Sequence, residues 1–256
     1  MKKKFSIVIA CFNSEKTIKC TLKSIINQTY KNWEIIIIDN KSKDRTLQIV
    51  RRFQAYNIKI FSSKDKGIYD AINKGIKLCS GDIISILHSN DFYNDNKVLD
   101  IVAKKFSNKM INIVHGNLFY VKKNNIKKIA RTWIGKNFNK KDFLQGLSPP
   151  HLSFFVKRKT YLSYGLYKNN LGNPADVELM YNYLIKYKLR NIYVNYFFVK
   201  MRLGGTSNRS LKNIYFQNLE ILKFLKINLN LFKIIYFFVY KFINRLKQIV
   251  ISRYYI

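Results

Sequence analysis

Residues 6–46, "SIVIACFNSEKTIKCTLKSIINQTYKNWEIIIIDNKSKDRT", alternate between two hydrophobic patterns. The segments 5–13 and 33–40 each begin with a run of apolar residues, which is typical of strands covered on both faces. Between them, Ile18, Leu22 and Ile25 recur at helical spacing, after polar residues that can cap a helix. The stretch therefore predicts a strand, a helix and a second strand.

The same alternation continues to residue 91. It predicts a helix over 42–56, a strand over 57–63, a helix over 67–81 and a strand over 82–91. Apolar strands separated by short helices favour a parallel sheet that helices cover on both faces. The fold class predicted is therefore α/β, a three-layer α/β/α arrangement with a mostly parallel central sheet.

Polar residues end several of these predicted strands. Asn13, Asp39 and Asp91 each lie at or just after a strand's carboxyl end. Because ligands of open α/β sheets bind beyond these ends, we expect one crevice to collect all three. The carboxylate of Asp91 is suited to a divalent metal, although an Asp at a strand end also serves as an ordinary turn former.

The second half of the chain has a different pattern. It predicts a helix over 96–106, antiparallel strands over 111–123 and 126–133, a loop region over 144–158, a helix over 174–188 and a strand from 191. From residue 211 the pattern is helical, basic and rich in aromatic residues. Its longest apolar run, 234–240, is too short to span a bilayer, so this tail could lie in the membrane interface or pack as core.

Charge and cysteine content limit the classes of function. The formal net charge is +33, which implies an anionic partner such as a phospholipid surface, a nucleic acid or a phosphorylated substrate. The three cysteines, Cys11, Cys20 and Cys79, include no CxxC pair and fit neither a disulfide framework nor a zinc site. We therefore expect a reducing compartment.

The first residues, "MKKKFSIVIACFN", permit a second interpretation as an export or lipoprotein leader. The apolar run is very short for a leader, and "FNSEKT" lies where small cleavage-site residues are needed. We expect it to be the first strand, with Cys11 reduced beside the ligand crevice.

The segments 6–46 and 64–91, the second being "KDKGIYDAINKGIKLCSGDIISILHSND", closely resemble the nucleotide-sugar-binding half of inverting family 2 glycosyltransferases of the GT-A fold. The resemblance extends over about residues 4–205 and is most specific in the first part. It implies a nucleotide-sugar-binding half at 1–115 and an acceptor-binding and catalytic half at 116–210. The basic aromatic tail then covers 211–256.

The resemblance implies a donor site at the first strand ends. There, the end of the first strand forms a wall of the nucleotide pocket, and Asp39 accepts hydrogen bonds from the base. The helix-capping role of Asp39 remains the alternative. The residues expected to contact the nucleotide are Ala10, Phe12, Asn13, Asp39, Asp65, Gly67 and Asn90.

The resemblance also implies a metal and a base. Asp91 matches the metal-binding end of a DxD-type motif, where Mn²⁺ or Mg²⁺ neutralises the departing diphosphate. This chain has "SND", so Asn90 replaces the second acid that many relatives carry. Asp176 is expected to be the catalytic base, with Glu178 as the alternate, although either could simply cap its helix.

The acceptor side is predicted from isolated residues. His151 falls in the expected acceptor loop, and Arg158 and Arg202 could pair with phosphate. Gly204 and Gly205 of "LGGTSN" could let a loop close over the donor and exclude water.

The leading hypothesis is an inverting transfer of a hexose or N-acetylhexosamine from a UDP-sugar to a lipid-diphosphate-linked surface glycan. The enzyme would lie on the cytoplasmic face of the inner membrane, held by its basic tail. The alternatives are an inactive GT-A protein with a glycan-binding or regulatory role and, less favoured, a nucleic-acid-binding protein. The positive charge is spread along the chain without a nucleic-acid-binding motif, which argues against the latter.

Overall fold

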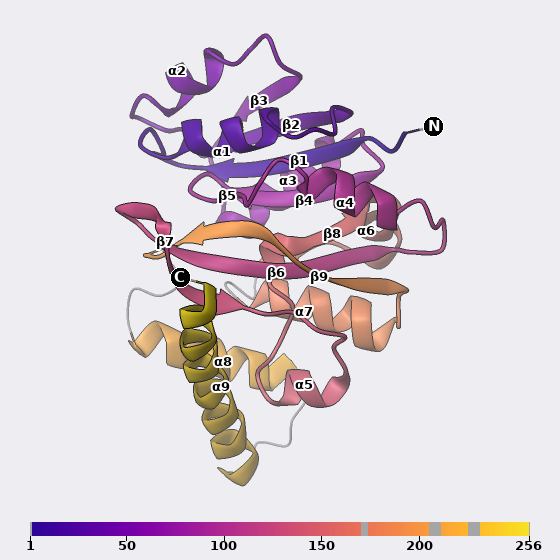
Figure 1. Ribbon diagram of the computed structural model, residues 1–256, viewed down its shortest axis with the longest axis vertical. Helices are drawn as coiled ribbons and strands as arrows, with labels where there is room; N and C mark the ends of the chain where they lie inside the picture. Colours follow the sequence, from indigo (N-terminus) through magenta and orange to yellow (C-terminus); the bar gives the residue numbers. More distant parts are fainter. Residues whose placement is uncertain (1, 170–173, 205–210, 225–230, 256) are drawn as a thin grey trace.

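The computed structural model describes residues 2–169, 174–204, 211–224 and 231–255, and Figure 1 shows how their elements are arranged. The N-terminal part contains β1 (Phe5–Cys11), α1 (Ile18–Ile26), β2 (Trp33–Asp39), α2 (Thr46–Arg51), β3 (Ile58–Ser62), α3 (Ile68–Leu78), β4 (Ile83–His88), β5 (Phe92–Tyr93) and α4 (Val98–Lys105). The following part contains β6 (Ile113–Lys122), β7 (Asn125–Trp133), α5 (Lys140–Leu144), a 3-10 turn at His151–Ser153, β8 (Phe154–Lys157), α6 (Arg158–Tyr164), α7 (Ala175–Tyr181), a π-helical turn at Asn182–Lys186 and β9 (Asn191–Arg202). The tail forms α8 (Leu211–Phe224) and α9 (Leu231–Ser252).

One continuous sheet runs through both halves in the order β3-β2-β1-β4-β8-β6-β9-β5, with β7 paired to β6. Strands β1 to β4 are parallel, as the sequence predicts. Beyond β4 the sheet is mixed, because β8 is antiparallel to both β4 and β6 while β9 is parallel to β6. The α/β fold class is confirmed, with an all-parallel group of strands β1 to β4 and a mixed group beyond it.

The strand β8 corrects a prediction. The sequence predicted a loop region over 144–158, but Phe154–Lys157 forms a buried strand between β4 and β6. Four residues are too few to give a clear alternating pattern, so the strand depends on pairing with neighbours far along the chain.

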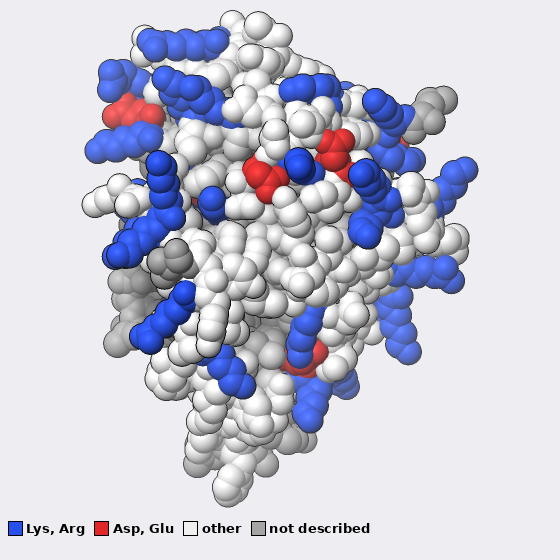
Figure 2. Space-filling view, in the orientation of Figure 1, with Lys and Arg blue, Asp and Glu red and all other residues white. Residues whose placement is uncertain are grey.

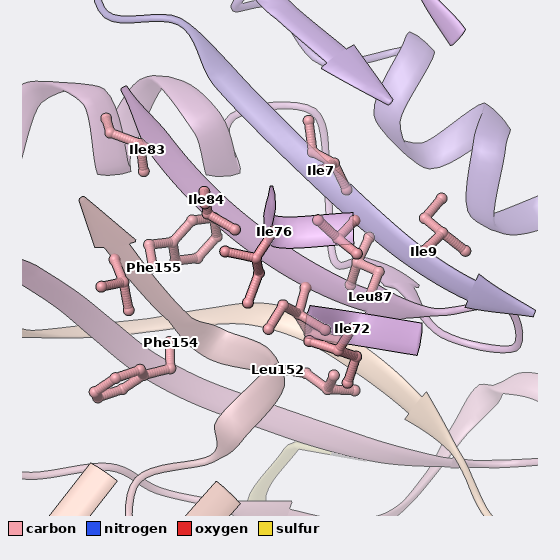
Figure 3. Close-up of a cluster of buried hydrophobic side chains, with 14 of the residues drawn as sticks. Ile7, Ile9, Ile72, Ile76, Ile83, Ile84, Leu87, Leu152, Phe154 and Phe155 are labelled. Atoms are coloured by element: carbon pink, nitrogen blue, oxygen red, sulfur yellow. The ribbon is translucent and has the colours of Figure 1, made fainter. Parts of the chain in front are cut away.

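The core lies between the sheet and its helices. Figure 3 shows Ile7, Ile83 and Phe155 of neighbouring strands, with Ile72 and Ile76 of α3 in the same cluster. All are buried, which explains the uninterrupted apolar runs of the strands.

The strand register aligns the polar ends of the parallel strands. Cys11 is opposite Asp39, and Ala10 is opposite His88. Since parallel strands end at the same edge, the loops after β1, β2 and β4 emerge together. This edge holds the candidate site.

The tail folds back on the rest of the molecule below the mixed part of the sheet, near β6 and β7 (Figure 1). Thr132 Oγ1 of β7 donates a hydrogen bond of 3.1 Å to the backbone oxygen of Gln248 in α9. Gln145 Nε2 donates at 2.9 Å to the Tyr236 hydroxyl. Within the part of the chain that the structure describes, no helix is both long and apolar enough to cross a bilayer.

Candidate active site

A cleft of about 680 Å³ opens at the carboxyl ends of β1 and β4. Its walls come from the β1–α1 loop, the first turn of α3, the start of α7, the end of β9 and the tail helices. Six of the residues expected to form the site line it: Phe12, Asn13, Asn90, His151, Asp176 and Arg202. Gly204, expected in a closing loop, also lines the cleft, whereas Gly205 lies outside the described residues.

Asn13 connects the loops that follow β1 and β2. Its Oδ1 accepts a hydrogen bond of 2.9 Å from the Lys43 backbone, and its own N–H donates to Ser42 Oγ at 2.9 Å. Its φ of 46° lies in the left-handed region, which Asn tolerates better than most residues. Asn13 therefore helps to set the shape of this wall, beside Phe12, a residue that is 55% exposed.

Asp39 lies below this wall and is fully buried. Its carboxylate accepts hydrogen bonds from the backbone and hydroxyl of Ser42 and, at 2.6 Å, from Ser62 Oγ. The Cys11 thiol lies 3.6 Å from Oδ1, and burial together with this carboxylate raises the Cys11 pKa. Both carboxylate oxygens of Asp39 thus accept hydrogen bonds from neighbouring residues of the protein.

The other residues predicted on the nucleotide side are near this wall but do not form the cleft surface. Ala10 is buried in β1. Asp65 forms an ion pair of 2.6 Å with Lys74. Gly67 precedes α3 with a φ of 125°, a conformation that favours glycine. None of these three is among the described residues that line the cleft.

Asp91 lies beneath the cleft surface and is fully buried. Its Oδ1 accepts a hydrogen bond of 3.0 Å from the Arg202 backbone, while Oδ2 has no hydrogen-bond partner among the described residues. Burial raises the Asp91 pKa to about 8, against the opposing effect of Arg202. The Arg202 guanidinium donates to the Asn90 carbonyl and lies 4.8 Å from the centre of the Phe92 ring.

Asp176 lies at the start of α7 and faces the cleft. Burial raises its pKa to about 6, although hydrogen bonds from the Val177 backbone and the Tyr69 hydroxyl act in the opposite direction. Its Oδ2 lies 3.4 Å from His151 Nδ1, and His151 Nε2 lies 3.3 Å from His88 Nε2. A carboxylate with a pKa near neutrality, open to the cleft, is suited to accept a proton.

Both histidines are neutral at physiological pH. Burial lowers the pKa of His151 to about 4 and that of His88 to about 3. The pair therefore supplies polar hydrogen-bonding groups beside Asp176, without a positive charge.

Two predicted residues lie away from the cleft. Glu178 forms an ion pair of 2.7 Å with Lys168 and accepts a hydrogen bond of 2.6 Å from Asn182. Arg158 follows β8, and its backbone N–H donates to Asp82, at the end of β4 opposite the cleft. Neither is among the described lining residues. The helix period explains why Glu178 does not line the cleft. It lies two residues after Asp176 on α7, and residues at this spacing point to different faces of a helix.

The fold brings to the cleft several residues that the sequence does not identify as site residues. Tyr69 comes from α3 and His88 from the end of β4. Lys241 and Arg245 come from α9, together with Asn218 of α8. The only signal in the sequence was the basic, amphipathic character of the tail, which does not reveal what it packs against.

The described residues of the site do not form a cluster of metal-ligating side chains. Among the described residues, no group of three or more His, Cys, Asp or Glu side chains is placed to hold an ion. The unpartnered buried oxygen of Asp91 fits a single protein ligand, with the remaining positions left to phosphate and water.

Comparisons with known proteins agree with this architecture. A curated relative, UDP-Glc:alpha-D-GlcNAc-diphosphoundecaprenol beta-1,3-glucosyltransferase WfgD of Escherichia coli, is 36% identical over 94 residues, covering 36% of this chain and 37% of that protein. The matched part of the chain thus spans little more than a third of this relative's length.

Two solved structures share the fold. S. aureus TarS 1–349 in complex with UDP-GlcNAc has a TM-score of 0.64 at 17% identity, covering 89% of this chain and 68% of that chain. The mannosyltransferase PcManGT of Pyrobaculum calidifontis, in complex with GDP-Man and Mn²⁺, has a TM-score of 0.64 at 15% identity, covering 87% and 64%. Residues 6–162 match the family described as Glycosyl transferase family 2, and the chain therefore belongs to that family.

Proposed function

We propose that this chain transfers a hexose or N-acetylhexosamine from a UDP-sugar to a hydroxyl of a lipid-diphosphate-linked glycan, with inversion at the anomeric carbon. The placement of Asp176 carries this proposal, because it lines the same cleft as the β1–α1 loop. The E. coli relative's name supports the choice of donor and acceptor, since it states UDP-Glc and GlcNAc-diphosphoundecaprenol.

The proposed reaction is a single displacement. The acceptor hydroxyl attacks the anomeric carbon as its proton passes to Asp176, and the bond between that carbon and the diphosphate oxygen breaks. The sugar then carries the new glycosidic bond, and UDP leaves with the electron pair. A correctly placed carboxylate base contributes about 10²- to 10⁴-fold to such a step.

Asp176 is tuned for this role by its surroundings. Burial raises its pKa to about 6, which keeps it ionised at neutral pH while making it a better proton acceptor than an exposed Asp. Glu178, already paired with Lys168, instead holds the start of α7 in place.

The donor diphosphate would meet a basic part of the cleft. Lys16 and Arg202 line it, and Arg202 is held by the Asn90 carbonyl. Asp91 would supply one oxygen to Mn²⁺ or Mg²⁺, with Asn90 beside it. Bound there, the ion would neutralise charge on the departing diphosphate.

We further infer peripheral attachment to the cytoplasmic face of the inner membrane. The net charge of +33 favours anionic lipid surfaces. Cys11, Cys20 and Cys79 are all free, as is typical of a reducing compartment. On α9, large apolar side chains such as Phe232 and Leu246 are exposed to solvent.

The test is a donor panel of UDP-Glc, UDP-Gal, UDP-GlcNAc and UDP-GalNAc with Mn²⁺ and a lipid-diphosphate GlcNAc acceptor. Release of UDP and the anomeric configuration of the product, read by NMR, are measured for the wild type, Asp176→Asn and Glu178→Gln. We expect Asp176→Asn to lose at least 10²-fold in kcat and Glu178→Gln to retain most of it. Equal turnover by Asp176→Asn would rule out Asp176 as the base, and silence with every donor would favour an inactive GT-A protein.

A further inference from the structure

A second cavity, of about 320 Å³, adjoins the catalytic cleft between β6, β7, the loop after α5 and the tail helices. We call it the basic chamber, because its lining includes Arg131, Lys241 and Arg245. Within the part of the chain that the structure describes, no Asp or Glu lines it. Three cations thus share a cavity with no acidic side chain on its walls.

Two of these cations, Arg131 and Lys241, are half-buried. The Arg131 guanidinium lies 3.8 Å from the centre of the Tyr120 ring, and its Nε is buried with no hydrogen-bond partner among the described residues. Lys241 donates to Asn218 Oδ1, and its burial lowers its pKa to about 8 despite the attraction of Asp176. Buried cations are costly unless something pairs with them, so the chamber is suited to an anion.

The chamber is continuous with the catalytic cleft. Both cavities are lined by Tyr120, Trp133, Asn218, Lys241 and Arg245. None of the donor-side loop residues 12–17 lines the chamber, although several of them line the cleft. An anion in the chamber would therefore approach Asp176 from the side of the tail, separately from the donor.

The chamber also reaches an exposed apolar surface. Phe238 and Phe242 of α9 line it, and Phe242 is 64% exposed. An apolar stripe runs along the exposed part of α9, because Phe232, Val239 and Leu246 recur at heptad spacing and all are exposed. In Figure 2, Lys and Arg side chains are scattered over a mostly white face, and few of them lie at the lower tip, where α9 is drawn in Figure 1.

Two cations of this helix, Lys241 and Arg245, thus line the cavities, while several of its large apolar side chains are exposed to solvent. Soluble monomers rarely expose such a continuous apolar stripe without a function for it. A ligand with a charged group and a hydrocarbon chain would satisfy both sides at once, since the charged group pairs with the chamber and the chain covers the stripe.

We propose that the basic chamber binds the diphosphate of the acceptor and that the acceptor's lipid chain lies along the exposed side of α9. This inference rests on the proposed function, which makes the acceptor a lipid diphosphate. It assigns to the tail a direct part in acceptor binding, in addition to any membrane contact. Arg131, Lys241 and Arg245 are the cations that would contact the diphosphate.

The chain provides its own probe for this site. Its only two tryptophans are Trp33 and Trp133, and only the second lines the chamber. In a Trp33→Phe background, the fluorescence of Trp133 reports binding. The ligands are GlcNAc-diphospho-octyl, octyl GlcNAc without phosphate, inorganic pyrophosphate and UDP, each titrated below its aggregation threshold.

The variants are Arg131→Gln and Lys241→Gln, with Lys247→Gln as the control, because Lys247 is an exposed residue of α9 that does not line the chamber. We expect each chamber variant to raise the Kd of GlcNAc-diphospho-octyl about tenfold or more and to leave those of octyl GlcNAc and UDP unchanged. Lys247→Gln should change none of them. Circular dichroism verifies that each variant is folded.

Three outcomes would overturn the inference. An unchanged Kd for GlcNAc-diphospho-octyl in both variants would remove the chamber as the diphosphate site. A parallel loss of UDP affinity would assign these cations to the donor. If pyrophosphate binds as tightly as GlcNAc-diphospho-octyl, the lipid chain contributes nothing to binding, and its proposed position along α9 is ruled out. If the wild type binds no UDP under any condition, the proposed function itself fails, so the two failures remain distinct.

Discussion

Oδ2 of Asp176 lies 3.4 Å from Nδ1 of His151, at the end of a short series in which His151 Nε2 lies 3.3 Å from His88 Nε2. The three side chains come from α7, the turn before β8 and the end of β4. Because burial keeps both imidazoles neutral, they lie beside the Asp176 carboxylate without lowering its basicity as a full positive charge would.

The rate of transfer should follow the ionisation of Asp176. Only the carboxylate can accept a proton, and burial raises its pKa to about 6. We therefore expect kcat to rise tenfold per pH unit below about pH 6 and to level off above it. Initial rates from pH 4.5 to 8 with saturating donor measure this. A rate independent of pH between 5 and 7 would contradict the assignment.

We expect His151 to act as a positioning residue in this arrangement. A proton on its Nδ1, 3.4 Å from Asp176 Oδ2, would stabilise the ionised carboxylate electrostatically, although these two atoms form no hydrogen bond in the described structure. Replacing it in His151→Phe should then move the acidic limb of the pH profile to higher pH, while His151→Asn, which keeps a donor, should restore part of the shift. A loss of kcat with an unmoved limb would show that His151 affects only the local structure.

The sequence predicts the N-terminal half of the molecule, where each strand and helix can be identified from its own short stretch of residues. The runs of β1, β2 and β4 identify their strands, and polar strand ends identify one edge of the sheet because parallel strands must end together. The pairing of His88 with His151 was not predictable, since it joins positions far apart in sequence. The contribution of Lys241 was missed for the same reason: a helical pattern shows which residues share a face but not what the face contacts.

Glu34 should make the protein sensitive to acid. Its buried carboxylate accepts hydrogen bonds from Ser6 and Ser80 and pairs with Lys4 and Lys59. Burial alone would raise its pKa, but these partners hold it at about 2, below the ordinary 4.5. A depressed carboxylate pKa stabilises the fold above the ordinary value, and that stability is lost as pH falls from about 4.5 toward 2.

Urea unfolding at a series of pH values measures this loss. Glu34→Gln should be less stable than the wild type at pH 7 and should show a smaller decrease in stability on acidification. The control is Glu220→Gln, whose side chain is 41% exposed and pairs only with Lys223 among the described ion pairs. If both variants keep the wild-type pH dependence, Glu34 is not its source.

Gly75 should be required for the packing of α3 on the sheet. A Cβ at this position would lie 2.4 Å from Val8 Cγ1 and 3.2 Å from Ile38 Cγ1. Overpacking of this kind costs about 1–3 kcal/mol, against a gain of about 1 kcal/mol in helix propensity. We expect Gly75→Ala to lower the free energy of unfolding by up to about 2 kcal/mol. In a Val8→Ala background the same change should cost less, and an equal cost would show that Val8 is not the obstacle.

Asp91 should carry metal binding without being needed for the fold. Its Oδ1 accepts the Arg202 N–H, a bond that an Asn side chain can keep, whereas the buried Oδ2 has no described partner and is the oxygen free for an ion. In a thermal unfolding assay, UDP with Mn²⁺ should raise the Tm of the wild type, and Asp91→Asn should abolish the part of this increase that is due to Mn²⁺.

The metal-free Tm of Asp91→Asn should equal or exceed that of the wild type, because a buried carboxyl group without a second partner is replaced by a neutral amide. Asp82→Asn, at the opposite end of β4, serves as the control and should retain the full Mn²⁺ effect. A Mn²⁺-dependent shift that survives in Asp91→Asn would place the ion elsewhere.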